Sequence, residues 1–569
     1  MLLAVVLTIV VIVIANLLFP PPTPQPAAPE AAEEPVDAPV PPAEPADPAV
    51  PPVAEVEEPV ARPPVEEPEL LPEETVTVSS ALYRYGFSSR GGGLVAAELV
   101  RYESFANEGQ VVDLVPEEAL ALLTHRVQLR DRDRRQELVL DFRRVQAAFE
   151  PEDGFRLGDI GEPDLLRTVL RDRETGITLH LEHRFDPDDY LIRVSGRLEG
   201  VDSQVYDRPI LLLDVGPSLA VHEVDPREDR REMAYVINSL HRGIESEDLE
   251  SVDSHRVAEG PLSWLALKNK YFLLAAVRGE GAEANDFGGI MARPAQYGDG
   301  TDITATLPFG QDWRFEYLLY AGPQQHDRLA AVGYNLEHVN PYGFRFLRPI
   351  IQPLTNVVTW ALVQMKLFLG VGYGWVLILF GILLRVLLWP IHARAMRAQI
   401  KNMAVQPLLK EIQEKYKGDQ ERLQKEMIRL YKEEGFNPLG GCLPMLIPFP
   451  ILITLFFVFQ GTIEFRGVEF MWLSDLSRPD PYYILPVALG GSMFLLQWLS
   501  ARVTPNPTPQ IKMMMWFLPI FMVVIFANFA SGLNLYYAAF NLATIPQQLQ
   551  LMRERQRLQK KTAPQEAAA

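Results

Sequence analysis

A single run of apolar residues constrains this chain most strongly. Residues 371–390, VGYGWVLILFGILLRVLLWP, are long enough to cross a bilayer as one helix. The run carries one charge, Arg385, which lies about 9 Å inside the helix end near residue 391. A guanidinium at that depth costs roughly 3 kcal/mol, so it requires water, a partner or a route to the headgroups. Two interpretations stay open, a functional charge and an arginine that merely extends to the membrane surface.

Five further apolar segments accompany this run. Residues 1–19 are apolar across a full span and no clear cleavage site follows, so we predict an uncleaved signal-anchor. Several of the four segments after Arg385 are at or below the usual span length, which reduced tilt or a locally thinned bilayer accommodates. Together with residues 371–391, the expected C-terminal spans are 438–460, 481–499, 512–528 and 531–550.

The distribution of lysine and arginine orients these spans. Residues 392–437 contain ten of them, whereas residues 461–480 contain two against four acidic residues. The tail, residues 551–569, is also basic. We therefore expect the 392–437 and 500–511 loops and the tail to be cytoplasmic, with the 461–480 loop outside. Six spans with both termini in the cytoplasm satisfy this distribution.

Residues 20–74 consist mainly of proline, alanine, valine and glutamate, with 14 acidic residues and one base, Arg62. Such a segment cannot bury enough apolar surface to offset its ordering entropy. We expect a disordered, extended spacer that holds most of the net charge of −20.

Short alternating strands fill residues 75–325. Residues 176–183 alternate in polarity, residues 186–189 (DPDD) form a turn, and residues 190–194 resume the alternation. About 250 residues of this pattern predict a β-sandwich, placed outside the membrane by the orientation above. His180 and His183 face opposite sides of one predicted strand, so they indicate no metal site.

Residues 326–370 connect the predicted sandwich to the membrane region. We predict a short amphipathic helix at 326–338 and a second helix at 342–369, whose apolar face is interrupted by polar residues. A helix of this kind can lie in the membrane interface. A plain linker helix packed on the sandwich is the alternative.

Apolar residues also recur at helical spacing in the 392–437 loop, on both sides of residues 417–419. We predict a helical hairpin with a charged outer face. Packing of one helix on the other explains most of the apolar stripes. Four residues add an adaptable docking face, namely Met396, Met403, Met427 and Tyr431.

Polar and small residues inside the spans mark a candidate groove. Its candidate residues are Arg385, Gly381, Gln460, Gln497, Asn534, Tyr537, Asn541 and Thr544. The four in the last span share one helical face. None of the five C-terminal spans contains Asp or Glu, so an arginine facing this stripe implies water within the bilayer. Helix–helix hydrogen bonding and close packing remain the alternative for each residue.

Several classes of protein fit poorly. A protease requires a nucleophile with a base, and Ser492, Ser500 and Ser531 have no such partner within the spans. A secondary transporter usually shows an internal repeat, and none is present among these spans. The single cysteine, Cys442, excludes an internal disulfide and a cysteine-based zinc site. The soluble part has no basic patch with interleaved aromatic residues, so nucleic-acid binding has little support.

Three groups of residues carry a family resemblance. They are residues 437–442 (NPLGGC), residues 480–486 (DPYYILP), and residues 531–537 (SGLNLYY) with the glutamines 547–548 downstream. In this order they resemble the YidC membrane protein insertase family over about residues 342–551, and Arg385 falls where that family places its groove arginine. The anchor, spacer and sandwich resemble the longer Gram-negative form, in which the sandwich is a periplasmic domain of sugar-binding-like fold.

The resemblance implies a fold and a function. The fold is a polytopic α-helical membrane protein, with a five-span insertase core, an N-terminal anchor span and a large periplasmic β-sandwich. The function is insertion of nascent membrane proteins into the bacterial inner membrane, alone or with the Sec translocon, without enzymatic activity or cofactor. It further implies a hydrophilic, positively charged groove at Arg385, with Tyr537 as a substrate contact.

Other implied partners are membrane lipids, and ribosomes or targeting factors at the cytoplasmic hairpin. Two features depart from the family pattern. Gly381 stands where some members carry a polar residue, and the short tail argues against strong ribosome binding through it.

Two other functions fit parts of the chain. A membrane-anchored chaperone or envelope-binding protein would act mainly through the periplasmic sandwich, so deletion of that domain would abolish its activity. A channel or transporter would instead show conductance or solute uptake in liposomes.

Overall fold

The computed structural model describes residues 73–566, except positions 118, 120, 134, 159–163, 282–283, 296–299, 342–347, 405, 417, 434–447 and 503–508. By its contacts the chain divides into two units, residues 1–70 and residues 71–569. The expected signal-anchor (1–19) and the expected spacer up to residue 72 lie outside the described residues. The 437–442 motif and the part of the 438–460 segment before residue 448 also lie outside them.

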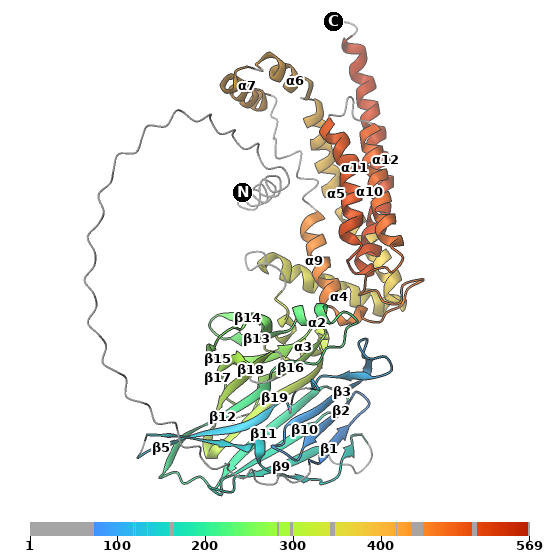
Figure 1. The fold of residues 1–569 in the computed structure, drawn as a ribbon. Coiled ribbons are helices and arrows are strands. Elements are labelled where there is room, and N and C mark those ends of the chain that lie inside the picture. Colours follow the sequence, from blue (N-terminus) through green and yellow to red (C-terminus); the bar gives the residue numbers. More distant parts are fainter. Residues whose placement is uncertain are drawn as a thin grey trace, which may run out of the picture. The chain divides into compact units, whose positions relative to one another are not determined.

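The first part of the second unit is β-rich, as predicted, and forms two sheets (Figure 1). The smaller has the order β4-β3-β2-β1-β8, and the larger has 14 strands. The strands are β1 (Thr75–Ser79), β2 (Tyr83–Ser88), β3 (Leu94–Glu103), β4 (Val111–Asp113), β5 (Thr124–Asp131), β6 (Glu137–Asp141), β7 (Ala147–Glu150), β8 (Phe155–Arg156), β9 (Leu165–Arg171), β10 (Thr178–Phe185), β11 (Leu191–Glu199), β12 (Tyr206–Gly216), β13 (Ala234–Ser239), β14 (Gly243–Asp248), β15 (Arg256–Lys268), β16 (Phe272–Arg278), β17 (Phe287–Pro294), β18 (Thr301–Pro308) and β19 (Arg314–Pro323).

Aromatic side chains join the two sheets. Tyr85 of β2 is fully buried and its hydroxyl donates to the backbone oxygen of Ala321 in β19, at 2.5 Å. Tyr83 stacks on Tyr85 with ring centroids 4.1 Å apart. Because a buried hydroxyl is costly without a partner, the Tyr85 bond helps to fix how the inner faces of the two sheets meet. The β-sandwich prediction is confirmed.

The hairpin of β10 and β11 follows the alternation predicted from the sequence. The strands pair antiparallel, with Phe185 opposite Ile192. His183 is buried whereas His180 is half-buried, so the two histidines face opposite sides as expected.

The second part of this unit is helical (Figure 1). Its helices are α4 (Arg348–Leu369), α5 (Tyr373–Ala404), α6 (Gln406–Lys415), α7 (Gln420–Glu433), α9 (Pro448–Gly461), α10 (Ile484–Arg502), α11 (Pro509–Phe526) and α12 (Ser531–Glu566). Shorter elements are η1 (Phe142–Arg144), α2 (Pro226–Arg231), η2 (Leu249–Ser251), η3 (Gln311–Trp313), α3 (His326–Val332), η4 (Leu336–His338) and η6 (Ile463–Phe465).

Two helices extend beyond the bounds expected from the sequence. We expected a span to end at residue 391, but α5 continues through Pro390 to Ala404, because the residues that follow are good helix formers. The first half of the predicted hairpin is therefore the end of α5 together with α6. In the same way α12 continues from the expected span 531–550 into the basic tail.

Four helices of this part are packed through three contacts, α11 on α10, α10 on α12 and α12 on α5. Within the described residues, one helix, Tyr373–Arg394, is both long and apolar enough to cross a membrane, with a mean hydropathy of 2.2. Shorter apolar helices are Ile451–Gly461, Ile484–Leu499 and Met515–Phe526.

Candidate functional site

Arg385 lies on α5 in contact with α12. Its side chain is 3% exposed, and its Nη2 donates to Oε1 of Gln547. The amide nitrogen of Gln547 in turn lies 3.4 Å from the backbone oxygen of Trp389, one turn further along α5. Arg385 Cζ also lies 5.3 Å from the ring centroid of Phe540, within range of a cation–π interaction. Phe540 and Gln547 therefore hold the guanidinium against α12.

Among the residues that the structure describes, no carboxylate neutralises the charge of Arg385. Within the described part of the chain, Arg385 forms no ion pair, and its Nε is buried without a hydrogen-bond partner. A buried charge normally has a counter-ion or several hydrogen bonds. Arg385 therefore keeps both its positive charge and an unused donor.

The polar residues along one face of α12 form hydrogen bonds with different helices. Asn534 Nδ2 donates to the backbone oxygen of Phe526 at 2.9 Å, at the end of α11. Asn541 Nδ2 donates to Ser492 Oγ of α10 at 3.2 Å. Thr544 Oγ1 donates to the backbone of its own helix, at Phe540. In this structure Asn534 and Asn541 therefore form hydrogen bonds between helices, which was the alternative to lining a groove.

Tyr537 points to a different environment from the other polar residues of its stripe. Its ring stacks on Phe526 and Phe540, with centroids 5.7 and 6.3 Å away. A recess lies beside it, between α5, α9 and α12, with about 230 Å³ of empty volume when open solvent is included. The recess is lined by Leu388, Ile451, Leu452, Tyr536, Tyr537 and Phe540.

The other candidate groove residues are more widely distributed. Gly381 is buried at a close approach of α5 to α12, since a Cβ there would lie 2.9 Å from the backbone oxygen of Tyr536. Gln460 is exposed in the last turn of α9, and Gln497 is half-buried on α10. Neither glutamine forms a hydrogen bond with Arg385 in the described structure.

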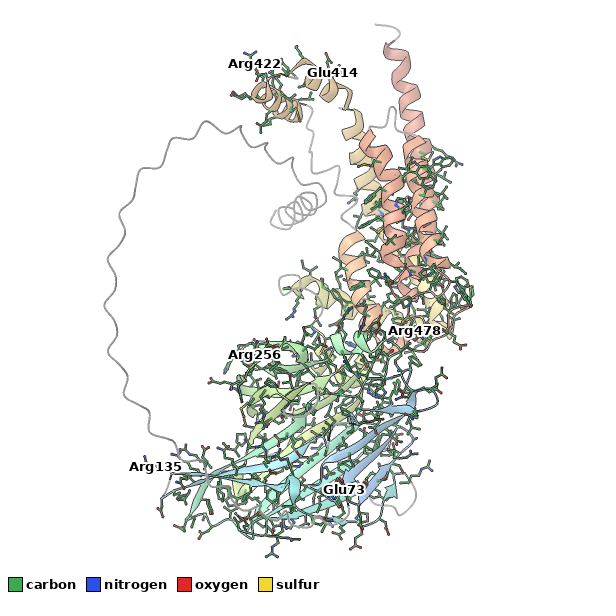
Figure 2. All side chains as sticks on the ribbon, viewed as in Figure 1. Glu73, Arg135, Arg256, Glu414, Arg422 and Arg478 are labelled. Carbon is green, nitrogen blue, oxygen red and sulfur yellow. The ribbon has the colours of Figure 1, made fainter. Side chains whose placement is uncertain are left out.

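The predicted docking face is described in part. The backbones of Met396, Met403 and Tyr431 are helical, but their side chains lie outside the described residues. Met427 is half-buried on α7. Charged side chains such as Glu414 and Arg422 are exposed on α6 and α7 (Figure 2).

The 461–480 loop fixes the start of α12. Ser531 N donates to the backbone oxygen of Arg478 at 2.7 Å, and its Oγ donates to that of Asp475 at 3.0 Å. Gly532 N donates to the backbone oxygen of Leu476 at 2.9 Å. These bonds satisfy free N–H groups of the first helical turn of α12. The loop therefore positions α12, the helix that contacts Arg385 of α5.

Sequence reasoning missed two partners of Arg385. Gln547 was noted only as part of a motif, and Phe540 was treated as an apolar residue of a span. The available signal was their spacing, because residues seven apart share a helical face.

Comparison with known proteins assigns the chain to a family. Two family models match it, "60Kd inner membrane protein" over residues 364–560 and "YidC periplasmic domain" over residues 75–357. A membrane protein insertase YidC from Geobacter sp. (strain M21) is 30% identical over 479 residues, covering 83% of this chain and 84% of that protein. The chain belongs to the YidC membrane protein insertase family. The YidC of Oleidesulfovibrio alaskensis, at 30% identity over 496 residues, covers 84% of this chain and 86% of its own length.

A solved YidC structure covers much of the same chain. It is described as an active YidC insertase with the first transmembrane domain resolved, is 17% identical, and covers 83% of this chain and 91% of its own. Its TM-score is 0.34, so the family assignment rests on the sequence matches.

Membership in the YidC family confirms the resemblance found in the motifs. The chain is an inner membrane protein insertase whose substrates are nascent membrane proteins. Its β-rich part is the YidC periplasmic domain, and its helical part matches the 60Kd inner membrane protein model.

Proposed function

We propose that Arg385 provides the positive charge of a hydrophilic groove formed by α5, α9, α10 and α12, along which the polar part of a substrate enters the bilayer. The pairing of Arg385 with an amide carries this proposal. A carboxylate partner would neutralise the charge, whereas Gln547 orients the guanidinium and leaves its charge available. An acidic or polar segment is then attracted towards α12, which shortens its path through hydrocarbon.

The apolar part of the substrate takes a neighbouring route. The recess beside Tyr537 is lined by aliphatic and aromatic side chains, which suit a hydrophobic helix as it passes α12. In this proposal Asn541 and Thr544 give the α12 side of the groove its polar character, and Gln460 and Gln497 add polar groups on α9 and α10. Gly381 allows α5 and α12 to approach closely behind the groove.

Insertion along this route needs no chemical energy source. Burial of the substrate's apolar surface in lipid provides about 25 cal/mol per Å². The membrane potential adds roughly 2.3 kcal/mol per 100 mV for each negative charge that moves outward.

The remaining partners follow from the proposed topology. The chain crosses the inner membrane six times, with both termini cytoplasmic and the sandwich in the periplasm. The hairpin of α6 and α7 receives ribosomes or targeting factors on its charged surface, and α4 lies against lipid. Small substrates are inserted by this protein alone, and larger ones together with the Sec translocon.

An insertion assay in a depletion strain tests the role of the charge. Arg385→Ala is expected to impair single-span substrates that carry acidic translocated tails, whereas Arg385→Lys is expected to retain part of the activity. Normal insertion by Arg385→Ala would overturn the charge role. A photoreactive residue in place of Tyr537 is expected to crosslink to a ribosome-bound nascent span, and one at the exposed position Tyr482 serves as the control.

A further inference from the structure

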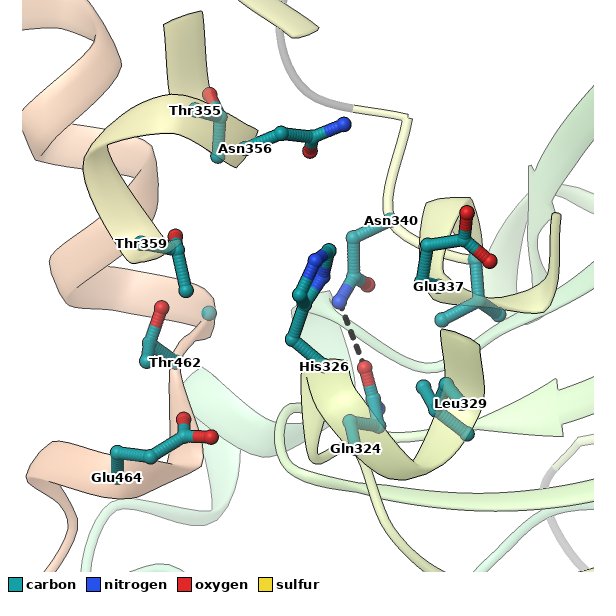
Figure 3. Close-up of a pocket in the computed structure, with 12 residues that line it drawn as sticks. Gln324, His326, Leu329, Glu337, Asn340, Thr355, Asn356, Thr359, Thr462 and Glu464 are labelled. Carbon is teal, nitrogen blue, oxygen red and sulfur yellow. Dashed lines mark hydrogen bonds between the residues drawn. The ribbon is translucent and has the colours of Figure 1, made fainter. Parts of the chain in front are cut away.

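A second cavity lies where the β-rich part of the chain (the β-domain, β1 to β19) meets the helical part, away from Arg385. It contains about 420 Å³ of empty volume, open solvent included, and is bounded by α3 and η4, by α4, and by α9 with η6 (Figure 3). Its wall is mainly polar. The polar groups used below belong to Glu337, Asn340, Asn356, Thr359, Thr462 and Glu464.

Two threonine residues that line this cavity have hydroxyl groups without a hydrogen-bond partner among the described residues. Thr359 is 7% exposed and Thr462 is 8% exposed, and neither hydroxyl forms a hydrogen bond with any described residue. In contrast, Thr355 of the same wall donates to the backbone oxygen of Ile351 at 3.0 Å. Both residues line the cavity, so their hydroxyls are available to a polar group placed between α4 and η6.

The amides of the cavity present acceptors. Asn340 Nδ2 donates to Gln324 Oε1 at 2.7 Å, and Asn356 Nδ2 lies 3.0 Å from His338 Nε2. Each Nδ2 thus has a hydrogen-bond partner, whereas neither Oδ1 accepts a hydrogen bond from a described residue. Figure 3 shows Asn356 extending from α4 over the cavity and Asn340 in its centre.

The charges around the cavity are mostly negative. Glu337 and Glu464 line it, whereas no lysine or arginine is among the lining residues. Lys366 lies nearby, but its Nζ is over the ring of Tyr373, 4.1 Å from the centroid, and forms no ion pair within the described structure. Glu337 is 3.5 Å from His338 Nδ1, whereas Glu464 forms no ion pair among the described residues.

We infer that this cavity binds a primary ammonium group, with Glu464 as its counter-ion and the hydroxyls of Thr359 and Thr462 and the Asn oxygens as further acceptors. An ammonium offers three donors and a positive charge, which match this set. Two sources share this chemistry, the headgroup of an aminophospholipid and a soluble amine. The adjacent α4 favours the lipid, since Val357, Trp360 and Phe368 are exposed on it, as in a helix that lies in a membrane interface.

The inference has a pH dependence whose direction follows from Glu464. Burial raises the pKa of Glu464 to about 7, and Asp327 raises it further while Lys366 opposes the shift. The carboxylate that binds an ammonium is therefore scarce below pH 7, so affinity is expected to rise as the pH increases through 7. The other titratable or charged groups around it are His326, Asp327, Glu337, His338, Lys366, Tyr373 and Tyr102.

Two arms of one experiment separate the sources. The full chain in lipid-free detergent is titrated with ethanolamine by calorimetry at pH 6 and pH 8. The same chain in nanodiscs containing phosphatidylethanolamine or phosphatidylcholine is analysed by native mass spectrometry for retained lipid. Glu464→Gln is expected to weaken binding at least tenfold in the arm that shows it, and the exposed Glu469→Gln is the matched control.

The outcomes decide the proposal. Retention of phosphatidylethanolamine over phosphatidylcholine, lost in Glu464→Gln, supports the lipid source, and ethanolamine binding alone supports a soluble amine. The double variant Thr359→Val, Thr462→Val keeps the carboxylate and is expected to bind severalfold more weakly. It tests the same cavity if Glu464→Gln does not fold. Binding that is absent in both arms, or unchanged in these variants, overturns the inference.

Discussion

Arg466 of the 461–480 loop forms a buried ion pair with Glu223 of the β-domain, with 2.7 Å between Nε and Oε1. The two side chains are 3% and 6% exposed. Arg466 Nη1 also donates to the backbone oxygen of Glu103 at 2.9 Å, and Cζ lies 4.0 Å from the ring centroid of Phe105. The same loop accepts hydrogen bonds from the first N–H groups of α12. The ion pair therefore connects the β-domain to α12, the helix that contacts Arg385.

We expect Arg466→Met to loosen this connection. Removing one partner of a buried ion pair leaves the other charge unpaired, which costs roughly 3–5 kcal/mol. Hydrogen exchange should increase in the loop and in the first turn of α12. Arg478→Met, at an exposed position of the same loop (Figure 2), is the control. The double change Arg466→Met, Glu223→Gln should recover part of the loss, and an unchanged exchange rate in Arg466→Met would contradict the coupling.

Replacing the neutral partner of Arg385 by an acid tests the proposed groove charge. Gln547→Glu keeps the shape of the side chain but supplies a counter-ion, so insertion of substrates with acidic tails should fall severalfold while substrates with neutral tails change less. Insertion of matched acidic and neutral substrates in a depletion strain measures this difference. Gln550→Glu, exposed one turn further along α12, introduces the same charge away from Arg385 and should have little effect. An equal loss for both kinds of substrate would count against an electrostatic role.

Local patterns predicted local structure well in this chain. The alternation before and after residues 186–189 placed β10 and β11, because strand periodicity and turn residues act over a few neighbours. The end of α5 could not be placed in this way. Hydropathy marks where a span leaves the apolar region, but the polar residues after Pro390 are themselves helix formers, so the helix continues.

The site was predicted less completely than the fold, because its contacts join distant residues. Arg385 could be selected from the sequence since a charge in an apolar run is costly. Its partner Gln547 is 162 residues away along the chain, and no periodicity specifies which face of α12 meets α5. Asn534 and Asn541 were predicted to share one face of the last span, and in the structure their amides bind to two different helices, α11 and α10.

Two buried histidines should make the β-domain sensitive to acid. Burial lowers the pKa of His125 to about 4 and that of His183 to about 3, from 6.5 in the unfolded chain. The unfolded state therefore binds protons first, so stability is fully present above pH 6.5 and is lost as the pH falls towards 4. Each histidine contributes on the order of 3 kcal/mol to this loss.

Denaturant unfolding of the full chain, followed by hydrogen exchange in β5 and β10, measures this loss at pH 7.5 and pH 4.5. His183→Phe, next to Phe87 and Phe185, should reduce the difference between the two conditions. His180→Phe, half-buried on the other face of β10, should leave it unchanged. The same acid sensitivity in His183→Phe as in the unaltered protein would show that other groups cause it.

A methyl group at Gly381 should separate the two helices that hold the groove charge. The added Cβ would lie 2.9 Å from the backbone oxygen of Tyr536, so α5 must move away from α12. Overpacking of this kind costs about 1–3 kcal/mol, and Arg385 lies one turn further along the same face. We therefore expect Gly381→Ala to lower the thermal unfolding temperature and to reduce insertion of acidic-tailed substrates. Gly491→Ala on α10 is the matched control, because nothing lies within 4 Å of its Cβ and alanine favours the helix. If the two variants behaved alike, the close approach at Gly381 would have no part in positioning Arg385.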